Sequence, residues 1–246
     1  MPNPLVRKLE QFTRLSAEDR GILERAGSAQ VRRYAPGEDV IAEGEEPREV
    51  NLVLSGWGCR YKQLEDGRRQ ITAFFLPGDL CDLNIFILRA MDHSVSALTT
   101  LTVAQLTREA FEQLMDGHPR ITQALWWEAL VNIAIQREWT VNIGQRNALE
   151  RVGHLLCELF IRLRATGLTS ENGCDFPITQ ADLAAATGLS VVHVNRTLQE
   201  LRHAGLIVLH GKHLSIPDFP ALMKVSLFNP NYLHLDRVGR HMDAVE

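Results

Sequence analysis

One predicted helix, starting near residue 191, concentrates side chains that can hydrogen-bond the edges of nucleobases. Its polar face carries asparagine, arginine and glutamine, and two valines lead it. Arginine can hold guanine through two hydrogen bonds, asparagine or glutamine can hold adenine in the same way, and valine methyls suit a thymine methyl. Such a helix is typical of one that enters a DNA major groove. The predicted base contacts are Val191, Val192, Asn195, Arg196 and Gln199.

Two short helices around a tight turn must position these side chains. Thr179 or Gln180 can open the first helix, and Gly188 can adopt the positive φ needed where that helix ends. Ser190 is a good N-cap for the second helix, because its hydroxyl can accept a hydrogen bond from a free backbone N–H. Polar groups around this turn and in the following hairpin predict phosphate contacts, which fix register. The predicted phosphate contacts are Thr179, Gln180, Ser190, His193 and Lys212.

The second helix also has an apolar stripe, and a β-hairpin follows it. Val194, Leu198 and Leu201 recur at helical spacing and predict a buried face. Residues 206–216 alternate around a His-Gly-Lys turn, which predicts a small wing with a basic tip. A helical hairpin with a solvated second helix is the alternative. The order of cap, polar first turn and wing favours a winged helix-turn-helix.

Composition is that of a globular protein with more than one domain. The chain has 246 residues, 45% hydrophobic and 23% charged, with a net charge of −4. Residues 146–246 hold ten Lys and Arg, ten Asp and Glu, and seven of the nine histidines. A neutral domain can bind DNA through a local basic stripe, and binding should then depend on salt. The N-terminus lacks the apolar core of a signal peptide, so a cytoplasmic protein is expected.

The N-terminal part alternates with the period of strands from residue 31 to about residue 107. Turn signals such as Pro36-Gly37 and Asp66-Gly67 separate the segments. This pattern predicts an antiparallel barrel or sandwich. The predicted domains are a sensor domain at residues 1–108, a dimerisation helix and hinge at 109–145, and a DNA-binding domain at 146–246.

The helix that follows Pro119 is apolar on more than one side, so more than one side must be buried. One face can pack on the β domain, and the other predicts a two-fold dimer, although both could pack within one chain. A second stripe contains Trp126, Leu130 and Ile133, and Gly144 is a candidate hinge. The predicted dimer contacts are Leu125, Ala129, Asn132, Gln136, Trp139 and Ile143.

Taken in order, these motifs resemble the Crp/Fnr superfamily of bacterial transcription regulators. The resemblance rests on 36–44, 52–56, 66–79 and 190–200, and it covers nearly the whole chain. It implies an α+β fold: an N-terminal antiparallel jelly roll like a cyclic nucleotide-binding domain, a long dimerisation helix and a C-terminal winged helix-turn-helix. It also implies a homodimer that binds a near-palindromic operator in double-stranded DNA, with RNA polymerase as a further partner.

The chain departs from this family where an effector would bind. Members that bind cyclic AMP carry a glutamate after the Pro-Gly-Asp turn and an Arg-Ser pair further on, and this chain has Asp82 and then His93-Ser94. Histidine is a poor substitute for a bidentate phosphate clamp, and Arg89 compensates only if its loop folds differently. A cyclic nucleotide is therefore not the expected cofactor, and a cyclic-nucleotide-responsive regulator is the alternative function. The candidate effector residues are Asp82, Arg89, His93 and Ser94.

The cysteines give no metal pattern. Oxygen-sensing relatives carry a cysteine cluster near the N-terminus, whereas no cysteine precedes Cys59 here, so an iron–sulfur cluster is not expected. Cys59 or Cys81 could act as a redox switch, but a buried structural thiol is the simpler interpretation. No cofactor and no metal are predicted.

Two other function classes compete with a DNA-binding regulator. A catalytic metal in the jelly roll needs about three converging ligands, and residues 1–145 hold only His93 and His118. An enzyme is therefore not predicted. A signalling module would use the winged domain to bind protein instead of DNA. The favoured interpretation is a homodimeric transcription regulator in which a signal at the jelly roll changes recognition-helix spacing.

Overall fold

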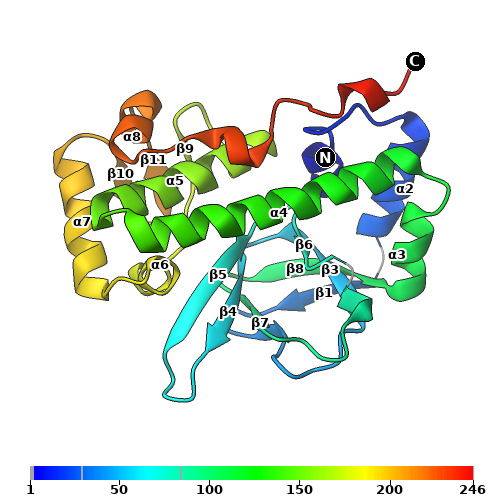
Figure 1. The fold of residues 1–246 in the computed structure, drawn as a ribbon, viewed down its shortest axis with the longest axis horizontal. Coiled ribbons are helices and arrows are strands. Elements are labelled where there is room, and N and C mark those ends of the chain that lie inside the picture. Colours follow the sequence, from blue (N-terminus) through cyan, green and yellow to red (C-terminus); the bar gives the residue numbers. More distant parts are fainter. Residues whose placement is uncertain (1–2, 29, 84, 246) are drawn as a thin grey trace. The chain divides into compact units, whose positions relative to one another are not determined.

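The computed structural model describes residues 3–28, 30–83 and 85–245 of the chain. They divide into two compact units (Figure 1). The jelly-roll unit comprises residues 1–62, 73–133 and 234–246, and the winged unit comprises residues 63–72 and 134–233. Among the described residues, no helix is long and apolar enough to span a membrane.

Two short helices open the jelly-roll unit, and side-chain caps start both. Helix α1 is Pro4–Leu9, where the Asn3 side chain accepts a hydrogen bond from the backbone N–H of Leu5. Helix α2 is Ala17–Gly27, where Ser16 and Asp19 form a capping box. Each cap satisfies an N–H that the helix cannot pair internally.

Two four-stranded antiparallel sheets form the jelly roll, with strand orders β1-β8-β3-β6 and β2-β7-β4-β5. The facing sides supply one apolar core, which includes Tyr34, Val53, Phe75 and Val103. This confirms the predicted antiparallel β domain, because alternation of period two puts every second side chain inside. The strands are β1 Gln30–Tyr34, β2 Asp39–Ile41, β3 Glu49–Ser55, β4 Gly58–Gln63, β5 Arg69–Phe75, β6 Leu80–Cys81, β7 Ser94–Ala97 and β8 Leu101–Thr107.

Three helices follow the sheets, after the short 3-10 turn η1 (Ile85–Ile87) between β6 and β7. They are α3 (Arg108–Met115), α4 (Pro119–Gln145) and α5 (Ala148–Ala165). Helix α4 runs through Gly144, so the break predicted there lies instead between α4 and α5. Asn147 and Glu150 form the capping box that starts α5. A single glycine near the end of a helix costs only about 1 kcal/mol, which explains why it does not end α4.

The winged unit contains the predicted helix-turn-helix and wing. Its sheet has the order β10-β11-β9, and α5 contacts both helices of the motif, α6 and α7. The elements are β9 Gly173–Asp175, α6 Gln180–Thr187, α7 Val191–His203, β10 Val208–His210, β11 His213–Ser215, α8 Phe219–Val225 and the 3-10 turn η2 Pro230–Leu233.

The C-terminal segment, residues 234–245, packs in the jelly-roll unit, and it contains the 3-10 turn η3 (Arg240–Met242). The backbone N–H of Gly239 donates to the Phe12 carbonyl at 3.0 Å, and Asp243 accepts from the Thr13 hydroxyl at 3.1 Å. Residues 239–243 accordingly lie beside the segment that joins α1 and α2. The sequence grouped this segment with the DNA-binding domain, whereas its packing partners are N-terminal.

Candidate nucleic-acid interface

Side-chain caps and one glycine fix the turn between α6 and α7. Thr179 caps α6 and forms a capping box with Asp182, so its hydroxyl is already hydrogen-bonded at 2.6 Å. Gly188 ends α6 with φ of 67°, a conformation that glycine adopts without a steric penalty. Ser190 accepts a hydrogen bond from the backbone N–H of His193 at 3.2 Å and starts α7. The local sequence alone therefore determines where both helices begin.

Helix α7 divides into a buried face and an exposed face. Val194, Leu198 and Leu201 are fully buried, as the apolar stripe predicts. Val191 and Val192 are 47% and 81% exposed, which is unusual for large apolar side chains at the start of a helix. Arg196 and Gln199 are exposed and Asn195 is half-buried. The residues predicted to contact bases thus share the accessible side of α7.

Two of these polar side chains have partners within the protein. The Asn195 amide donates to the Gln180 side chain at 3.1 Å, which links α7 to the first turn of α6. Arg196 lies 3.1 Å from a ring nitrogen of His193 and 3.7 Å from Glu200. The sequence reasoning missed Glu200, although its i,i+4 spacing from Arg196 is the signal for such a pair. Both Arg196 and Glu200 are exposed, so their ion pair contributes little to stability. Arg196 can therefore leave Glu200 and bind DNA at little cost in free energy.

The wing presents Lys212 at the tip of a two-stranded hairpin. His210 pairs with His213 across the turn, and Gly211 between them has a φ of 59°. Lys212 is exposed, and its backbone carbonyl accepts a hydrogen bond from the N–H of Phe176 at 2.7 Å. This bond fixes the tip against the strand that precedes α6. The lysine side chain is left to reach outward, as a phosphate contact requires.

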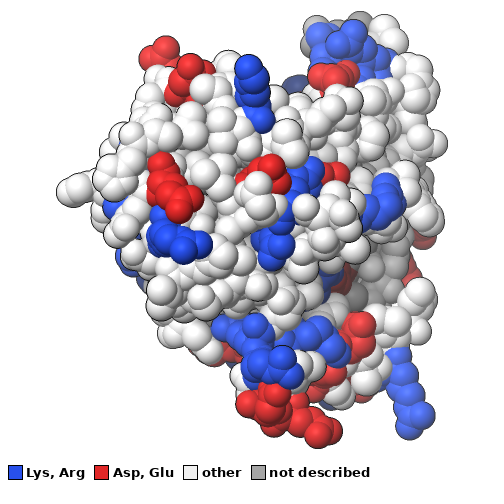
Figure 2. Space-filling view, turned by 60° about the vertical axis from the view of Figure 1, so that its left-hand side comes forward, with Lys and Arg blue, Asp and Glu red and all other residues white. Residues whose placement is uncertain are grey.

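Charge on this protein is distributed in small groups. On the face shown in Figure 2, lysine and arginine groups stand among aspartate and glutamate groups, and most of the surface is uncharged. This agrees with the equal numbers of basic and acidic residues from residue 146 onward. Attraction to DNA must then come from a few local contacts, which salt screens over about 10 Å.

Comparison with known proteins identifies both units. The model of the cyclic nucleotide-binding domain family matches residues 31–118, and that of the Crp-like helix-turn-helix domain matches residues 150–225. The transcriptional activator protein FnrL of Cereibacter sphaeroides is 31% identical over 78% of this chain and 79% of its own. The chain belongs to the Crp/Fnr family of transcription regulators.

Two further members of the Crp/Fnr family support this assignment. The nitrogen fixation regulation protein FixK of Bradyrhizobium diazoefficiens is 31% identical over 72% of this chain and 74% of its own. The solved structure of FixK2 from Bradyrhizobium japonicum superposes with a TM-score of 0.72 at 25% identity, covering 80% of this chain and 96% of that chain. The protein is accordingly a DNA-binding transcription regulator of the Crp/Fnr type, and the predicted fold class is confirmed.

The effector residues predicted from the Crp/Fnr resemblance only partly come together. Asp82 accepts from Arg60 at 2.8 Å and lies 2.8 Å from the Nε2 atom of His93. Burial alone would lower the pKa of His93, but its hydrogen bonds to Asp82 and Asp92 raise it above the ordinary value. An incoming anion would have to displace Asp82 from both cations. This arrangement does not favour a cyclic phosphate.

The other two predicted effector residues do not join this cluster. The Ser94 hydroxyl accepts a hydrogen bond from the backbone N–H of Glu43 at 2.9 Å. Arg89 is exposed in the segment that contains η1, so it does not replace the missing phosphate clamp. Arg60 was not singled out from the sequence, because an arginine on an alternating strand carries no specific signal.

The exposed stripe of α4 differs from the one predicted to form the dimer. Leu125 and Trp139 are 2% and 5% exposed, so contacts within this chain already bury them. Trp126, Leu130 and Ile133 are 61%, 59% and 51% exposed. Of the remaining predicted dimer residues, Ala129, Asn132 and Gln136 are half-buried and Ile143 is exposed. Periodicity defined both stripes, but only packing shows which one remains free.

The four cysteines form no disulfide, and all of them are buried. Burial raises the pKa of Cys81 well above its ordinary value, and it raises the pKa of Cys157 and Cys174 to about 12. Thiols with raised pKa values contain little reactive thiolate near neutral pH. Within the described part of the chain, no three His, Cys, Asp or Glu side chains group as metal ligands would.

Proposed function

We propose that this regulator acts as a homodimer whose two α7 helices enter successive major grooves of a near-palindromic operator. The observation that carries the proposal is the exposed face of α7, where Arg196 and Gln199 stand beside two exposed valines. Successive major grooves on one side of DNA lie about 34 Å apart, a spacing that a two-fold dimer can match.

The proposed base contacts are Val191, Val192, Asn195, Arg196 and Gln199. Arg196 is exposed, and so is its ion-pair partner Glu200, so the guanidinium is accessible to a base. Asn195 uses one amide donor on Gln180, so its base contact is through the remaining amide groups. The valines would favour thymine through its methyl group. Thr179, Gln180, Ser190, His193 and Lys212 are the proposed phosphate contacts, and their role is to set register.

We place the dimer contact on the exposed stripe of α4. Its members alternate in steps of three and four residues, which is the repeat of a two-helix coiled coil. The large apolar members are the ones most exposed in a single chain, and pairing would remove them from water. The stripe consists of Gln123, Trp126, Leu130, Ile133, Arg137, Thr140 and Gly144.

In the proposed mechanism, a signal received by the jelly-roll unit changes the pairing of α4 and with it the spacing of the two α7 helices. RNA polymerase is the proposed further partner, since the relative FnrL is named as a transcriptional activator protein. The proposed site of action is the cytoplasm, where a bacterial regulator meets DNA.

Selection from a pool of random DNA duplexes tests the base contacts. The wild-type protein should enrich a two-fold-related pair of half-sites. Arg196→Ala should lose about 1–3 kcal/mol on the selected site and relax base preference at one position of each half-site. Arg202→Ala is the matched control, because Arg202 lies on the last turn of α7 and donates to the Leu198 carbonyl. An unchanged preference profile in Arg196→Ala would refute its assignment.

Sedimentation of an α4 variant tests the dimer. Ile133→Asp should turn the protein into a monomer, because each copy would bring a charge into the seam. Its affinity for the full operator should fall with the loss of the second half-site. Val225→Asp, at an exposed apolar position of α8, is the control and should remain dimeric. If Ile133→Asp forms a dimer of unchanged stability, the dimer interface does not include this stripe of α4.

A further inference from the structure

The inward face of the sheet β1-β8-β3 changes from apolar to polar along its strands. Tyr34, Val53 and Val103 face the core shared with the opposite sheet. Two residues further along their strands, the same face carries Arg32, Asn51 and Gln105, at the positions where strand alternation would continue the core. Asn51 and Gln105 pair directly in the register of β3 and β8. Asn51 and Gln105 are buried on this face, whereas Arg32 is exposed. Buried polar side chains cost stability and therefore mark a candidate site.

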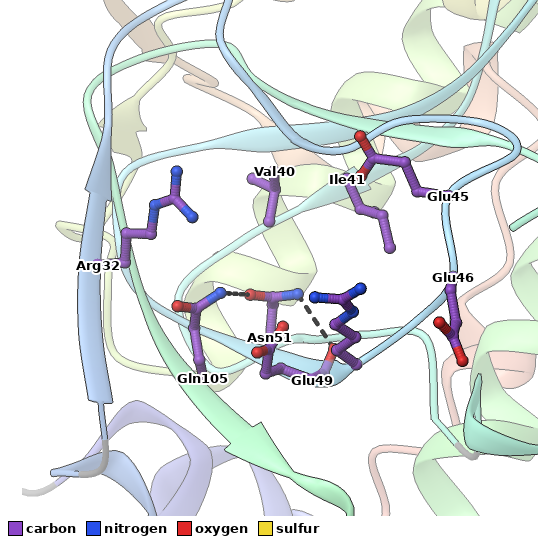
Figure 3. A pocket seen from close by; sticks show the side chains of 9 residues that line it. Arg32, Val40, Ile41, Glu45, Glu46, Glu49, Asn51 and Gln105 are labelled. Carbon is purple, nitrogen blue, oxygen red and sulfur yellow. Dashed lines mark hydrogen bonds between the residues drawn. The ribbon is translucent and has the colours of Figure 1, made fainter.

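A cavity of about 390 Å³ opens at this polar end of the sandwich. Figure 3 shows Asn51 and Gln105 along one side, with Val40 and Ile41 opposite them and Arg32 at one end. Its volume falls within the range of roughly 300–1,000 Å³ that small-molecule sites occupy. None of the Asp82 cluster lines it, so the cavity is separate from the effector position that the sequence suggested.

The amides of the cavity are buried but weakly bonded. Asn51 and Gln105 are 5% and 7% exposed. The Gln105 side chain donates to Asn51, and Asn51 donates to the carbonyl of Glu49, both at the long distance of 3.4 Å. Within the described residues, the Gln105 side-chain oxygen accepts no hydrogen bond. Buried amides normally have well-formed partners, so this pair can gain hydrogen bonds from a ligand.

Charges of both signs surround these amides. Arg32 and Arg48 line the cavity together with three carboxylates, Glu45, Glu46 and Glu49. The Arg32 guanidinium lies 4.7 Å from the centre of the Tyr34 ring, and Arg32 lines the same cavity as the buried amides. Val40 and Ile41 supply the apolar side. A molecule that matches this lining carries one carboxylate, one ammonium group and a short aliphatic part.

We propose that this cavity binds an α-amino acid with an aliphatic side chain as an effector. Its carboxylate pairs with Arg32, its ammonium group lies among the rim glutamates, and its side chain packs on Val40 and Ile41. Asn51 and Gln105 complete the hydrogen bonds of the polar end. The inference rests on the proposed function, in which the jelly-roll unit receives the signal, and it names the chemical class of that signal.

Calorimetric titration of the purified full chain tests the site, with valine as the first probe and the other standard amino acids after it. Binding is expected at concentrations up to about 10 mM. Two analogues separate the charges of valine: 3-methylbutanoate lacks the ammonium group, and isobutylamine lacks the carboxylate. Each should bind at least about tenfold more weakly than valine. Binding of no amino acid, or equal binding of either analogue, overturns the proposal.

A pair of variants assigns the binding to this cavity. Arg32→Gln should weaken amino-acid binding at least about tenfold. Arg33→Gln is the control, because this exposed neighbour does not line the cavity. Equal weakening by both variants, or by neither, overturns the assignment. Circular dichroism confirms that each variant is folded.

Random-DNA selection, run both without and with added valine, separates the two hypotheses. A protein that selects half-sites but binds no amino acid leaves the proposed function in place and removes this inference. A protein that binds valine through Arg32 but selects no half-site in either condition retains the cavity assignment and loses its role as an effector site.

Discussion

The jelly-roll unit and the winged unit both bury polar side chains, and they surround them differently. In the jelly-roll unit, Asn51 and Gln105 border an open cavity and share a single hydrogen bond of 3.4 Å. In the winged unit, Glu158 is fully buried and accepts from Trp139 at 3.0 Å and from Tyr232 at 2.8 Å. The amides of Asn51 and Gln105 can therefore form further hydrogen bonds with a ligand. The carboxylate of Glu158 already accepts its hydrogen bonds from side chains inside the core.

The Glu158 cluster, which also contains Trp139 and Tyr232, keeps the Glu158 carboxylate sealed from solvent and joins parts of the winged unit that are distant in sequence. Trp139 lies on α4, Glu158 on α5 and Tyr232 on the turn η2, so one carboxyl group connects three elements. Burial raises the pKa of Glu158, and Arg162 opposes that rise from one turn away. The buried polar groups of the winged unit therefore stabilise its fold. The side chains that could contact DNA lie on the exposed face of α7.

The largest expected effect compares one residue from each arrangement. Glu158→Ala should lower the free energy of unfolding of the winged unit by about 3–5 kcal/mol, because it removes a fully buried acceptor and leaves its donors inside the core. Asn51→Ala should cost the jelly-roll unit less than about 1 kcal/mol, since water in the cavity can replace the amide.

Hydrogen exchange measured separately for the amides of α5 and β8 gives the free energy of each unit. Glu158→Gln keeps the shape of the side chain and should retain much of the stability lost in Glu158→Ala. Equal costs for Glu158→Ala and Asn51→Ala would remove the distinction between a sealed and an open polar cluster.

A second effect follows from His154, which is fully buried in the winged unit. Its ring stacks on Tyr232 and meets Phe228 edge-on. Burial, with a smaller contribution from Arg146, lowers its pKa from 6.5 to about 3. Glu138 lies 3.3 Å away but is itself paired with Arg146, so it does not hold a proton on the histidine.

Acid should therefore destabilise the winged unit. Below pH 6.5 the unfolded chain binds a proton that the folded chain excludes, and this difference continues down to about pH 3. The stability due to His154 should be complete above pH 6.5 and lower by about 2 kcal/mol near pH 5. His154→Phe keeps the ring packing and should flatten the pH dependence of α5 exchange. His203→Gln, an exposed change on α7, should not, and a flat profile in the unmodified protein would contradict this account.

A smaller effect concerns the C-terminal segment, which belongs to the jelly-roll unit. A Cβ added to Gly239 would lie 2.5 Å from the Phe12 ring, and that ring stacks on Trp127 at 5.8 Å. Gly239→Ala should therefore cost on the order of 1 kcal/mol through overpacking. Gly144→Ala is the control, because a Cβ there meets nothing within 4 Å and alanine favours the helix.

Proteolysis and thermal unfolding of the two glycine variants measure this difference. Gly239→Ala should release the C-terminal segment to protease earlier than the unmodified protein does, and Gly144→Ala should be at least as resistant. Equal resistance of both variants would mean that the segment does not depend on its contact with Phe12.

Local sequence was sufficient to predict the helix-turn-helix. Thr179, Gly188 and Ser190 act through hydrogen bonds and backbone conformations within three or four residues, so their roles can be read without a fold. The alternating strands and the family resemblance were likewise confirmed, because both depend on order along the chain. The base and phosphate contacts stay predictions, since they depend on a bound duplex.

Tertiary structure decided which of two similar apolar stripes stays exposed. Periodicity gave α4 two apolar stripes, and packing covered Leu125 and Trp139 while it left Trp126 and Leu130 exposed. The cavity beside Gln105 needed β3 and β8 in register, and the docking of Gly239 on Phe12 joins residues 227 positions apart in the sequence. Sequence alone determined the elements and their caps because those interactions are local. Burial, cavities and long-range docking are properties of the packed chain, and no single segment contains them.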